Sequence, residues 1–145
     1  MKTVRHVLDV KGSEVYTIGP DASVLQALER LAEKDVGALV VTETDGRIVG
    51  MLTERDYARK VALLGRLSRD TPVRDIMTRE VICVAPEQQV DTCMALMTRK
   101  RFRHLPVVVD QRLSGIVSIG DVVKAIMDEQ QFAIEQLEHY IMGGR

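Results

Sequence analysis

Apolar side chains recur in this chain with two spacings, one typical of helices and the other typical of strands. Apolar residues at positions 24, 28 and 31 have the helical spacing and follow oxygen-bearing residues that favour a helix start. The runs Ala38 to Thr42 and Ile48 to Leu52 are rich in β-branched residues, and Asp45-Gly46 between them is typical of a tight hairpin turn. With a short extended segment at Tyr16 to Ile18 and another helix from Glu54, the first half is predicted to run strand, helix, strand, strand, helix.

The same order of elements is predicted again in the second half of the chain. Val15 to Pro20 aligns with Val81 to Pro86 at an offset of 66 residues, and Asp56 aligns with Asp121 at an offset of 65. The one-residue deletion falls in the predicted hairpin turn, where related sequences commonly differ in length. A unit of about fifty residues cannot bury its sheet and its helices alone, so we expect the two copies to pack against each other.

These observations divide the chain into four segments and predict a mixed α/β (α+β) fold. We place the first repeat at residues 1–67, a linker of turn-forming residues at 68–72, the second repeat at 73–128, and an extension of the last helix at 129–145. The second repeat is expected to begin with a short helical segment, Val73 to Met77.

Composition and charge narrow the classes of function. The 145 residues are 46% apolar and 28% charged, which is globular composition, and the net charge of −1 disfavours a dedicated nucleic-acid binder. No apolar run approaches the ~20 residues of a membrane span, and the start lacks the apolar region of a signal peptide, so we expect a cytoplasmic location. Cys83 and Cys93 lack the spacing of zinc ligands, so we predict two reduced thiols and no metal site.

The repeated corners Thr53-x-x-Asp56 and Ser118-x-x-Asp121 are the most specific candidate sites. One interpretation is structural, since a hydroxyl followed three residues later by a carboxylate caps a helix N-terminus. The other is functional, since a carboxylate at such a corner can accept two hydrogen bonds from the vicinal hydroxyls of a ribose. The two interpretations are compatible.

A basic run precedes the second copy's hairpin and makes the two copies unequal. Arg103 and His104 adjoin the predicted strand, and a guanidinium pointing between the copies would suit a phosphate. A solvated helix end is the alternative for the two residues before them. The first copy has Val36-Gly37-Ala38 at this place and carries no charge there, while Arg55 is a possible second anion ligand.

Catalytic motifs are missing from the sequence. There is no Gly-x-Ser-x-Gly, no Gly-x-x-x-x-Gly-Lys-Ser/Thr loop and no His-Glu-x-x-His, and the three histidines are scattered. We therefore predict that the protein is not an enzyme.

Taken together, the motifs resemble a tandem pair of CBS domains, also called a Bateman module, of the small stand-alone bacterial type. The resemblance rests on Val73-Arg-Asp-Ile-Met77, on Val15-x-Thr-Ile-x-Pro20 and its echo at 81–86, on Arg103-His-Leu-Pro-Val-Val108, and on the two corners. It implies two β-α-β-β-α repeats packed with pseudo-two-fold symmetry. It also implies a sensor that binds AMP, ADP, ATP, NAD or S-adenosylmethionine in clefts between the repeats, with no catalytic cofactor.

The resemblance further implies two sets of nucleotide-binding residues. The first cleft would use Thr17, Ile18, Gly37, Ala38, Arg103, His104, Ile116, Ser118, Gly120 and Asp121. The second would use Met51, Thr53, Arg55, Asp56, Ile82 and Cys83. Because Cys83 replaces the hydroxyl that Thr17 offers, we rank the cleft of Asp121 first.

The expected partners are an adenine nucleotide, a second copy of the chain in a homodimer, and a separate regulated protein. The alternative is a protein–protein interaction module that holds no small molecule and docks through its last helix. RNA or DNA binding through Lys100, Arg101 and Arg103 is a minor option, because the net charge is near zero and aromatic residues are few. The identity of the nucleotide, the number of occupied clefts and the regulated protein are left open by the sequence.

Overall fold

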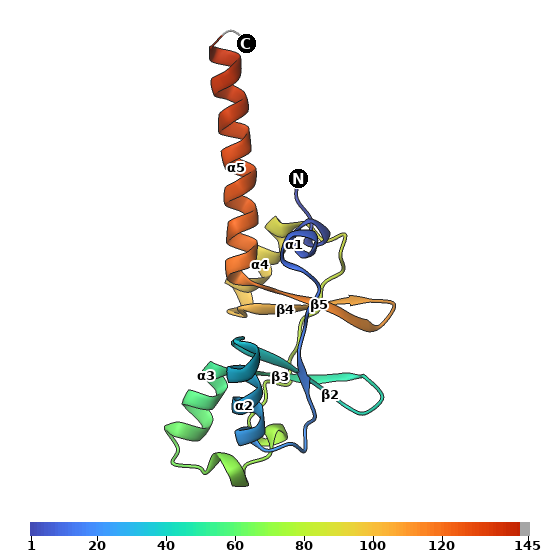
Figure 1. Ribbon diagram of the computed structural model, residues 1–145, viewed down its shortest axis with the longest axis vertical. Coiled ribbons are helices and arrows are strands. Elements are labelled where there is room, and N and C mark those ends of the chain that lie inside the picture. The colour runs from blue at the N-terminus through green and yellow to red at the C-terminus, as the bar shows by residue number, and fades with distance from the viewer. Residues whose placement is uncertain (143–145) are drawn as a thin grey trace.

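Two small β-sheets, one from each half of the chain, face each other at the centre of the structure (Figure 1). The computed structural model describes residues 1–142. In the first sheet, β1 (Thr17–Ile18) pairs parallel to β2 (Ala38–Thr42), which pairs antiparallel to β3 (Ile48–Thr53). The second sheet consists of the antiparallel pair β4 (His104–Val109) and β5 (Arg112–Ser118).

Strand register confirms the predicted duplication. Ile18 pairs with Val41 in the first sheet, and Val84 forms a single parallel bridge to Val107 in the second, both at the offset of 66. A register irregularity follows Val41 in β2 and follows Val107 in β4. The two halves therefore share one fold down to the position of a bulge, and the first strand of the second copy is reduced to one bridge.

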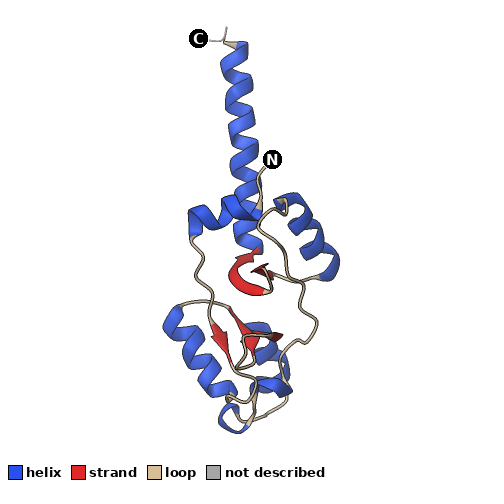
Figure 2. Cartoon of the chain, turned by 90° about the vertical axis from the view of Figure 1, so that its right-hand side faces the viewer, coloured by secondary structure: helices blue, strands red, loops and turns tan. Residues whose placement is uncertain are grey.

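Helices flank the sheets on their outer sides (Figure 2). They are α1 (Val4–Lys11), α2 (Val24–Lys34), α3 (Glu54–Tyr57), α4 (Val90–Lys100) and α5 (Ile119–Ile141). A π-helical turn, Ala58–Ala62, continues α3, and 3₁₀ turns lie at Ser68–Asp70 and Val73–Asp75. The predicted helix start after Pro20 is confirmed, because Ser23 accepts a hydrogen bond from the backbone N–H of Gln26 and caps α2.

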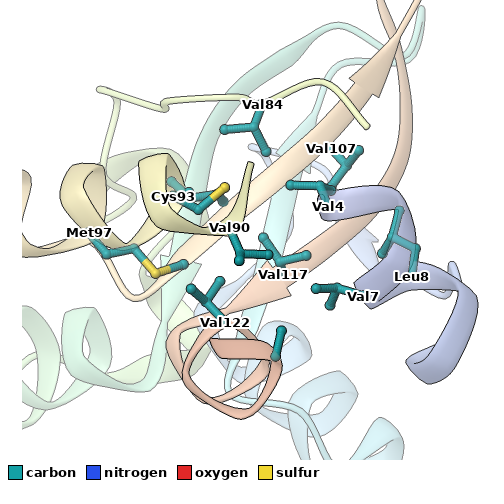
Figure 3. Close-up of a cluster of buried hydrophobic side chains, with 12 residues drawn as sticks. Val4, Val7, Leu8, Val84, Val90, Cys93, Met97, Val107, Val117 and Val122 are labelled. Atoms are coloured by element: carbon teal, nitrogen blue, oxygen red, sulfur yellow. The ribbon is translucent and has the colours of Figure 1, made fainter. Parts of the chain in front are cut away.

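Each half of the structure takes part of its core from the other half of the sequence. Val4, Val7 and Leu8 of α1 pack among core residues of the second half, such as Val107 and Val117 (Figure 3). Conversely, the core of the first half includes three residues from the lead-in to the second repeat, which are Val73, Ile76 and Met77. Neither repeat supplies its whole hydrophobic core, because the chain crosses twice between the halves. The repeat boundaries at residues 67 and 73 describe the duplicated sequence and stay a prediction.

Two equivalent strand glycines make room for these crossing segments. A Cβ at Gly50 would lie 2.7 Å from the Sδ of Met77, and a Cβ at Gly115 would lie 3.1 Å from the side chain of Leu8. A glycine inside a strand often marks the close approach of another segment. The crossing segments themselves meet between the sheets, where Val15 and Val81 join an apolar cluster centred on Val40.

The last helix leaves the body of the structure. Its first turns pack against α4 and α1, and its C-terminal turns project away from all other elements (Figure 1). Within residues 1–142, no helix has the length and apolarity that crossing a membrane would require. The last three residues of the predicted extension, 143–145, lie outside the described residues.

Candidate functional site

A cavity of about 450 Å³ opens between the two halves, beside the corner of Asp56. We call it the Asp56 cleft. Its walls come from the end of β3 with α3, from residues 78–82 where the chain crosses from the first half to the second, and from the loop between α4 and β4. The lining residues are Gly37, Met51, Thr53, Glu54, Arg55, Asp56, Arg59, Lys60, Thr78, Glu80, Val81, Ile82, Arg101, Phe102, Arg103 and His104.

Asp56 is recessed in this wall and is held by four groups. Its Oδ2 accepts hydrogen bonds from the backbone N–H and the hydroxyl of Thr53, at 3.0 and 3.2 Å. Its Oδ1 accepts a hydrogen bond from the hydroxyl of Thr78 and lies 3.1 Å from the Nζ of Lys60. The residue is 8% exposed, so the carboxylate is fixed in position. The predicted helix cap is thus present, and the capping carboxylate also lines the Asp56 cleft.

The lining of the Asp56 cleft is cationic in a chain whose net charge is −1. Five arginine and lysine side chains line it against three aspartate and glutamate side chains, so the lining carries a net charge of +2. Backbone geometry helps to form the loop that carries two of the cations. Arg101, like its counterpart Asp35 at the offset of 66, has a left-handed backbone that ends its helix. The cleft is therefore suited to an anion.

His104 begins β4 and reaches both corners. Burial, together with the nearby positive charges of Lys11 and Arg103, lowers the pKa of His104 below its ordinary value, although Asp121 opposes the shift. A neutral imidazole is therefore favoured at neutral pH, and it offers a ligand one donor and one acceptor rather than a charge.

The equivalent corner at Asp121 is closed by a lysine. Ser118 and Asp121 form the same reciprocal cap, with the backbone N–H of Ser118 donating to Asp121 at 2.8 Å. The Nζ of Lys11, at the end of α1, lies 2.7 Å from the same carboxylate oxygen and donates to the carbonyl of Ile116 at 3.0 Å. A hollow of about 50 Å³ adjoins this corner, and its lining consists of Lys2 and of residues of α1 and α5, including Lys11 and Asp121; we call it the Asp121 cleft.

The same lysine affects the ionisation of Asp121. Burial opposes ionisation of the carboxyl group, but hydrogen bonds from Lys11 and Ser118 outweigh burial and lower the pKa of Asp121. The carboxylate is therefore charged and already paired within the chain.

The structure brings together some of the predicted residues and separates others. Gly37, Arg103 and His104, which the sequence groups with Asp121, line the Asp56 cleft beside five residues of the second predicted set. Those five are Met51, Thr53, Arg55, Asp56 and Ile82. Their roles in binding stay predictions, but their proximity is a property of the fold.

Other predicted residues lie elsewhere. Thr17 and Ile18 line a shallow depression against α2, where the carbonyl of Thr17 accepts a hydrogen bond from Arg30 at 2.9 Å. Ala38 and Ile116 belong to the apolar cluster between the sheets. Gly120 borders an open apolar groove at the start of α5, and Cys83 is exposed.

Sequence reasoning missed the residue that most distinguishes the two corners, Lys11. A signal was present, because aligning Val4 to Leu8 with Val73 to Met77 places Lys11 opposite Glu80, a reversal of charge. Thr78, Arg59 and Lys60 were also missed, since their places in the cavity depend on the crossing segment and on the π-helical turn.

The described residues offer no arrangement for metal binding. No group of three His, Cys, Asp or Glu side chains in this part of the chain is placed to hold a metal ion. Burial raises the pKa of both thiols, that of Cys93 to about 11, so both stay protonated at neutral pH.

Comparison with known proteins agrees with this architecture. Residues 7–63 and 73–128 each match the CBS domain. The chain is 44% identical over 128 residues to the mitochondrial CBS domain-containing protein CBSX3 of Arabidopsis thaliana, covering 86% of this chain and 62% of the plant protein. It is 34% identical over 116 residues to the CBS domain-containing protein YhcV of Bacillus subtilis, covering 80% of this chain and 81% of YhcV.

Solved structures show the same fold. A protein with CBS domains from Burkholderia ambifaria, provisionally described as a signal-transduction protein, superposes with a TM-score of 0.83 at 46% identity, covering 89% of this chain and 96% of that one. A hexameric CBS-CP12 protein from bloom-forming cyanobacteria superposes with a TM-score of 0.75 at 28% identity, covering 85% and 70%. CBS-domain proteins are generally regulatory rather than catalytic. With two matched domains and two interlocked β-α-β-β-α halves, this chain belongs to the CBS-domain family and consists of a tandem CBS pair.

Proposed function

We propose that this CBS pair binds an adenine nucleotide (AMP, ADP, ATP or NAD) in the Asp56 cleft and signals its occupancy to a separate protein. The observation that supports this proposal is the combination of a recessed carboxylate with an excess of cations in one cavity of about 450 Å³. That volume is within the ~300–1,000 Å³ typical of small-molecule sites. In a nucleotide the ribose lies next to a phosphate, so its site needs a carboxylate for the ribose hydroxyls and a cation for the phosphate close together.

Each part of a nucleotide has a candidate partner in the cavity. The ribose hydroxyls would donate to Asp56. Lys60, which lies against that carboxylate and donates to the carbonyl of Ile76 at 2.9 Å, would exchange these contacts for a phosphate, and its side chain is 42% exposed. Arg59, Arg101 and Arg103 would meet the phosphates. The apolar side chains of Met51, Val81, Ile82 and Phe102 would pack against the adenine ring.

Signalling follows from the origin of the lining. Residues 51–60 belong to the first half and residues 101–104 to the second, so a bound nucleotide contacts both halves at once. A ligand shifts an equilibrium only by its differential affinity for the two states. A ligand that contacts both halves binds with different affinity to two arrangements of the halves, because its contacts change when the halves move relative to each other.

The test is isothermal titration calorimetry of the purified chain with AMP, ADP, ATP and NAD. We expect micromolar binding of at least one nucleotide, with one ligand per chain. Asp56→Asn keeps the shape of the corner but loses the charge that strengthens two hydrogen bonds, so binding is expected to weaken by about 30-fold or more. The matched control is Asp121→Asn, which is expected to change the affinity by less than about twofold. Absence of heat with all four nucleotides, or equal weakening by both variants, would contradict the proposal.

The proposal includes self-association and a regulated partner protein. The two free thiols, Cys83 and Cys93, fit a reducing compartment such as the cytoplasm. The exposed apolar side chains of α5 favour a second candidate function, a protein–protein interaction module without a small-molecule ligand. Retention of partner binding in the Asp56→Asn variant, at any nucleotide concentration, would favour that second function.

A further inference from the structure

The projecting part of α5 is a feature that nucleotide binding does not use. Residues 130–141 are all exposed, and the helix extends away from the body of the structure (Figures 1 and 2). Isolated helices shorter than about 12–15 residues are marginal in water. A helix with so many exposed apolar residues is better explained by a partner that covers one of its faces.

Exposed apolar residues on this helix recur with the spacing of a coiled coil. Val123, Met127, Ile134, Leu137 and Ile141, with Gln130 completing the series, are separated by steps of four, three, four, three and four residues. We call these six residues the seam. Alternating steps of three and four define the a and d positions of a heptad repeat, on which two helices pack knobs into holes. The apolar residues of the seam are all exposed, between 38% at Val123 and 79% at Ile141.

The seam is separate from the face that packs on the body. Val122 and Ala125 are buried against the rest of the fold, and the carboxylate of Glu129 accepts a hydrogen bond from the backbone N–H of Lys2 at 2.9 Å. The seam lies beside this face and continues onto the body, where Val123 and Met127 border an open apolar groove. The seam runs from Val123 to Ile141, which is about 27 Å along the helix axis.

We propose that the seam is an interface between two copies of this chain, paired through α5 as a two-stranded coiled coil. The charges on the helix favour this occupant. No Lys or Arg occurs between residues 125 and 142, and the acidic residues Asp128, Glu129 and Glu135 lie at positions outside the interface. Of the residues that flank the seam between Gln130 and Ile141, only Glu138 is acidic, so two copies can pair without opposing rows of like charge.

A second copy of the chain also agrees with the heptad spacing of the seam and with its single polar residue, Gln130. Two identical helices share the same repeat along the whole seam, as a coiled coil requires. Gln130 interrupts the apolar series near its centre, and one polar residue at such a position sets the register of a pair. Because the family match ends at residue 128, the projecting seam belongs to this chain's own extension and not to the shared CBS fold.

The test is the molar mass of the full chain without nucleotide, by light scattering coupled to size exclusion and by sedimentation at several concentrations. The variant Ile134→Glu with Leu137→Glu places two charges in the seam and is expected to halve the mass, to 16.2 kDa if the starting species is a dimer. The matched control is Phe132→Glu, because Phe132 is as exposed as Leu137, at 63%, but lies off the seam. We expect this control to keep the mass of the unmodified chain.

Three results would overturn the proposal. They are a monomeric unmodified chain at tens of micromolar, an unchanged mass in the seam variant, or an equal loss of mass in the control. Circular dichroism of the seam variant should show a folded body, since its core residues are untouched. Nucleotide binding is measured separately, so this proposal and the proposed function can fail independently.

Discussion

The two corners of this duplicated protein have the same local structure but adjoin cavities of very different size. At both, a hydroxyl and an aspartate three residues later cap a helix reciprocally, Thr53 with Asp56 and Ser118 with Asp121. Yet a cavity of about 450 Å³ adjoins Asp56 and one of about 50 Å³ adjoins Asp121. The cap is inherited by both copies, so the cap cannot account for the difference.

The crossing segments account for it. The segment that passes Asp56 presents Thr78, whose backbone pairs with Met51 and whose hydroxyl donates to the carboxylate. The segment that passes Asp121 ends in Lys11, which binds the carboxylate from within the chain. Both carboxylates are paired with a lysine, Asp56 with Lys60 of its own half and Asp121 with Lys11 from the other half. The difference teaches that, in this fold, the residue arriving from the other half distinguishes two otherwise equivalent corners.

Replacing Lys11 is expected to have the largest effect on the difference between the two corners. In Lys11→Met, Asp121 loses its internal partner and the cation leaves the cleft. We expect a second, weaker nucleotide-binding event, so that the stoichiometry in calorimetry rises from one to two ligands per chain. Lys11→Arg, which keeps the charge, is the control and should bind one. A stoichiometry of one in Lys11→Met would mean that the small volume of the cleft, rather than Lys11, keeps it closed.

A smaller effect is expected from the cation nearest to β4. Arg103→Ala removes a proposed phosphate ligand, and because Arg103 is exposed, water screens the interaction. We expect the affinity for ATP to fall about tenfold, or about 1.4 kcal/mol, and the affinity for adenosine to stay unchanged. Competition titrations with both compounds measure the two effects. A parallel loss for adenosine would place Arg103 away from the phosphates.

Acid should destabilise the fold through His104. Its pKa is lowered in the folded state, so below its ordinary pKa of about 6.5 the unfolded chain binds more protons than the folded chain. The stability that neutral His104 contributes is present above that value and is lost as the pH falls through the folded pKa. Urea unfolding at pH 7.5 and 5.5 should therefore show a smaller loss in His104→Gln than in the unmodified chain. An equal loss in both would exclude His104 as the cause.

The smallest effect concerns Asp121 and requires stronger acid. Its pKa is lowered, so its contribution is present above the ordinary value of about 3.9 and is lost as the pH falls through the folded pKa. The ion pair with Lys11 is partly exposed, with side chains 31% and 24% accessible, so we expect at most about 1 kcal/mol. In Asp121→Asn, the free energy of unfolding should differ from that of the unmodified chain at pH 6, and the difference should shrink as the pH falls below 3.9. A constant difference across this range would show that the pair contributes nothing.

Local sequence patterns were enough to predict most of the fold. The spacing of Val24, Leu28 and Leu31 predicts α2, and the offset of 66 predicts that β2 and β4 occupy equivalent places. Such features depend on neighbours within a few residues. Both aspartate corners were predicted for the same reason, since a cap is a four-residue device.

Features that depend on the path of the chain were not predicted. Nothing local to Val4 or Leu8 indicates that α1 packs in the second half, and that exchange brings Lys11 to Asp121. The packing of the two halves against each other brings Arg103 and His104 to the Asp56 cleft, whereas Thr17 in β1 lines neither cleft. Whether a corner is open depends on long-range contacts that sequence periodicity does not contain.

The most direct measurement is a nuclear magnetic resonance titration of the isotope-labelled chain with AMP, following every backbone amide. We predict shifts at residues 53–60, 78–82 and 101–104, while the amides of Gly120, Asp121 and Thr17 stay in place. Shifts centred on Ser118 and Asp121, with the corner of Asp56 unchanged, would contradict this prediction.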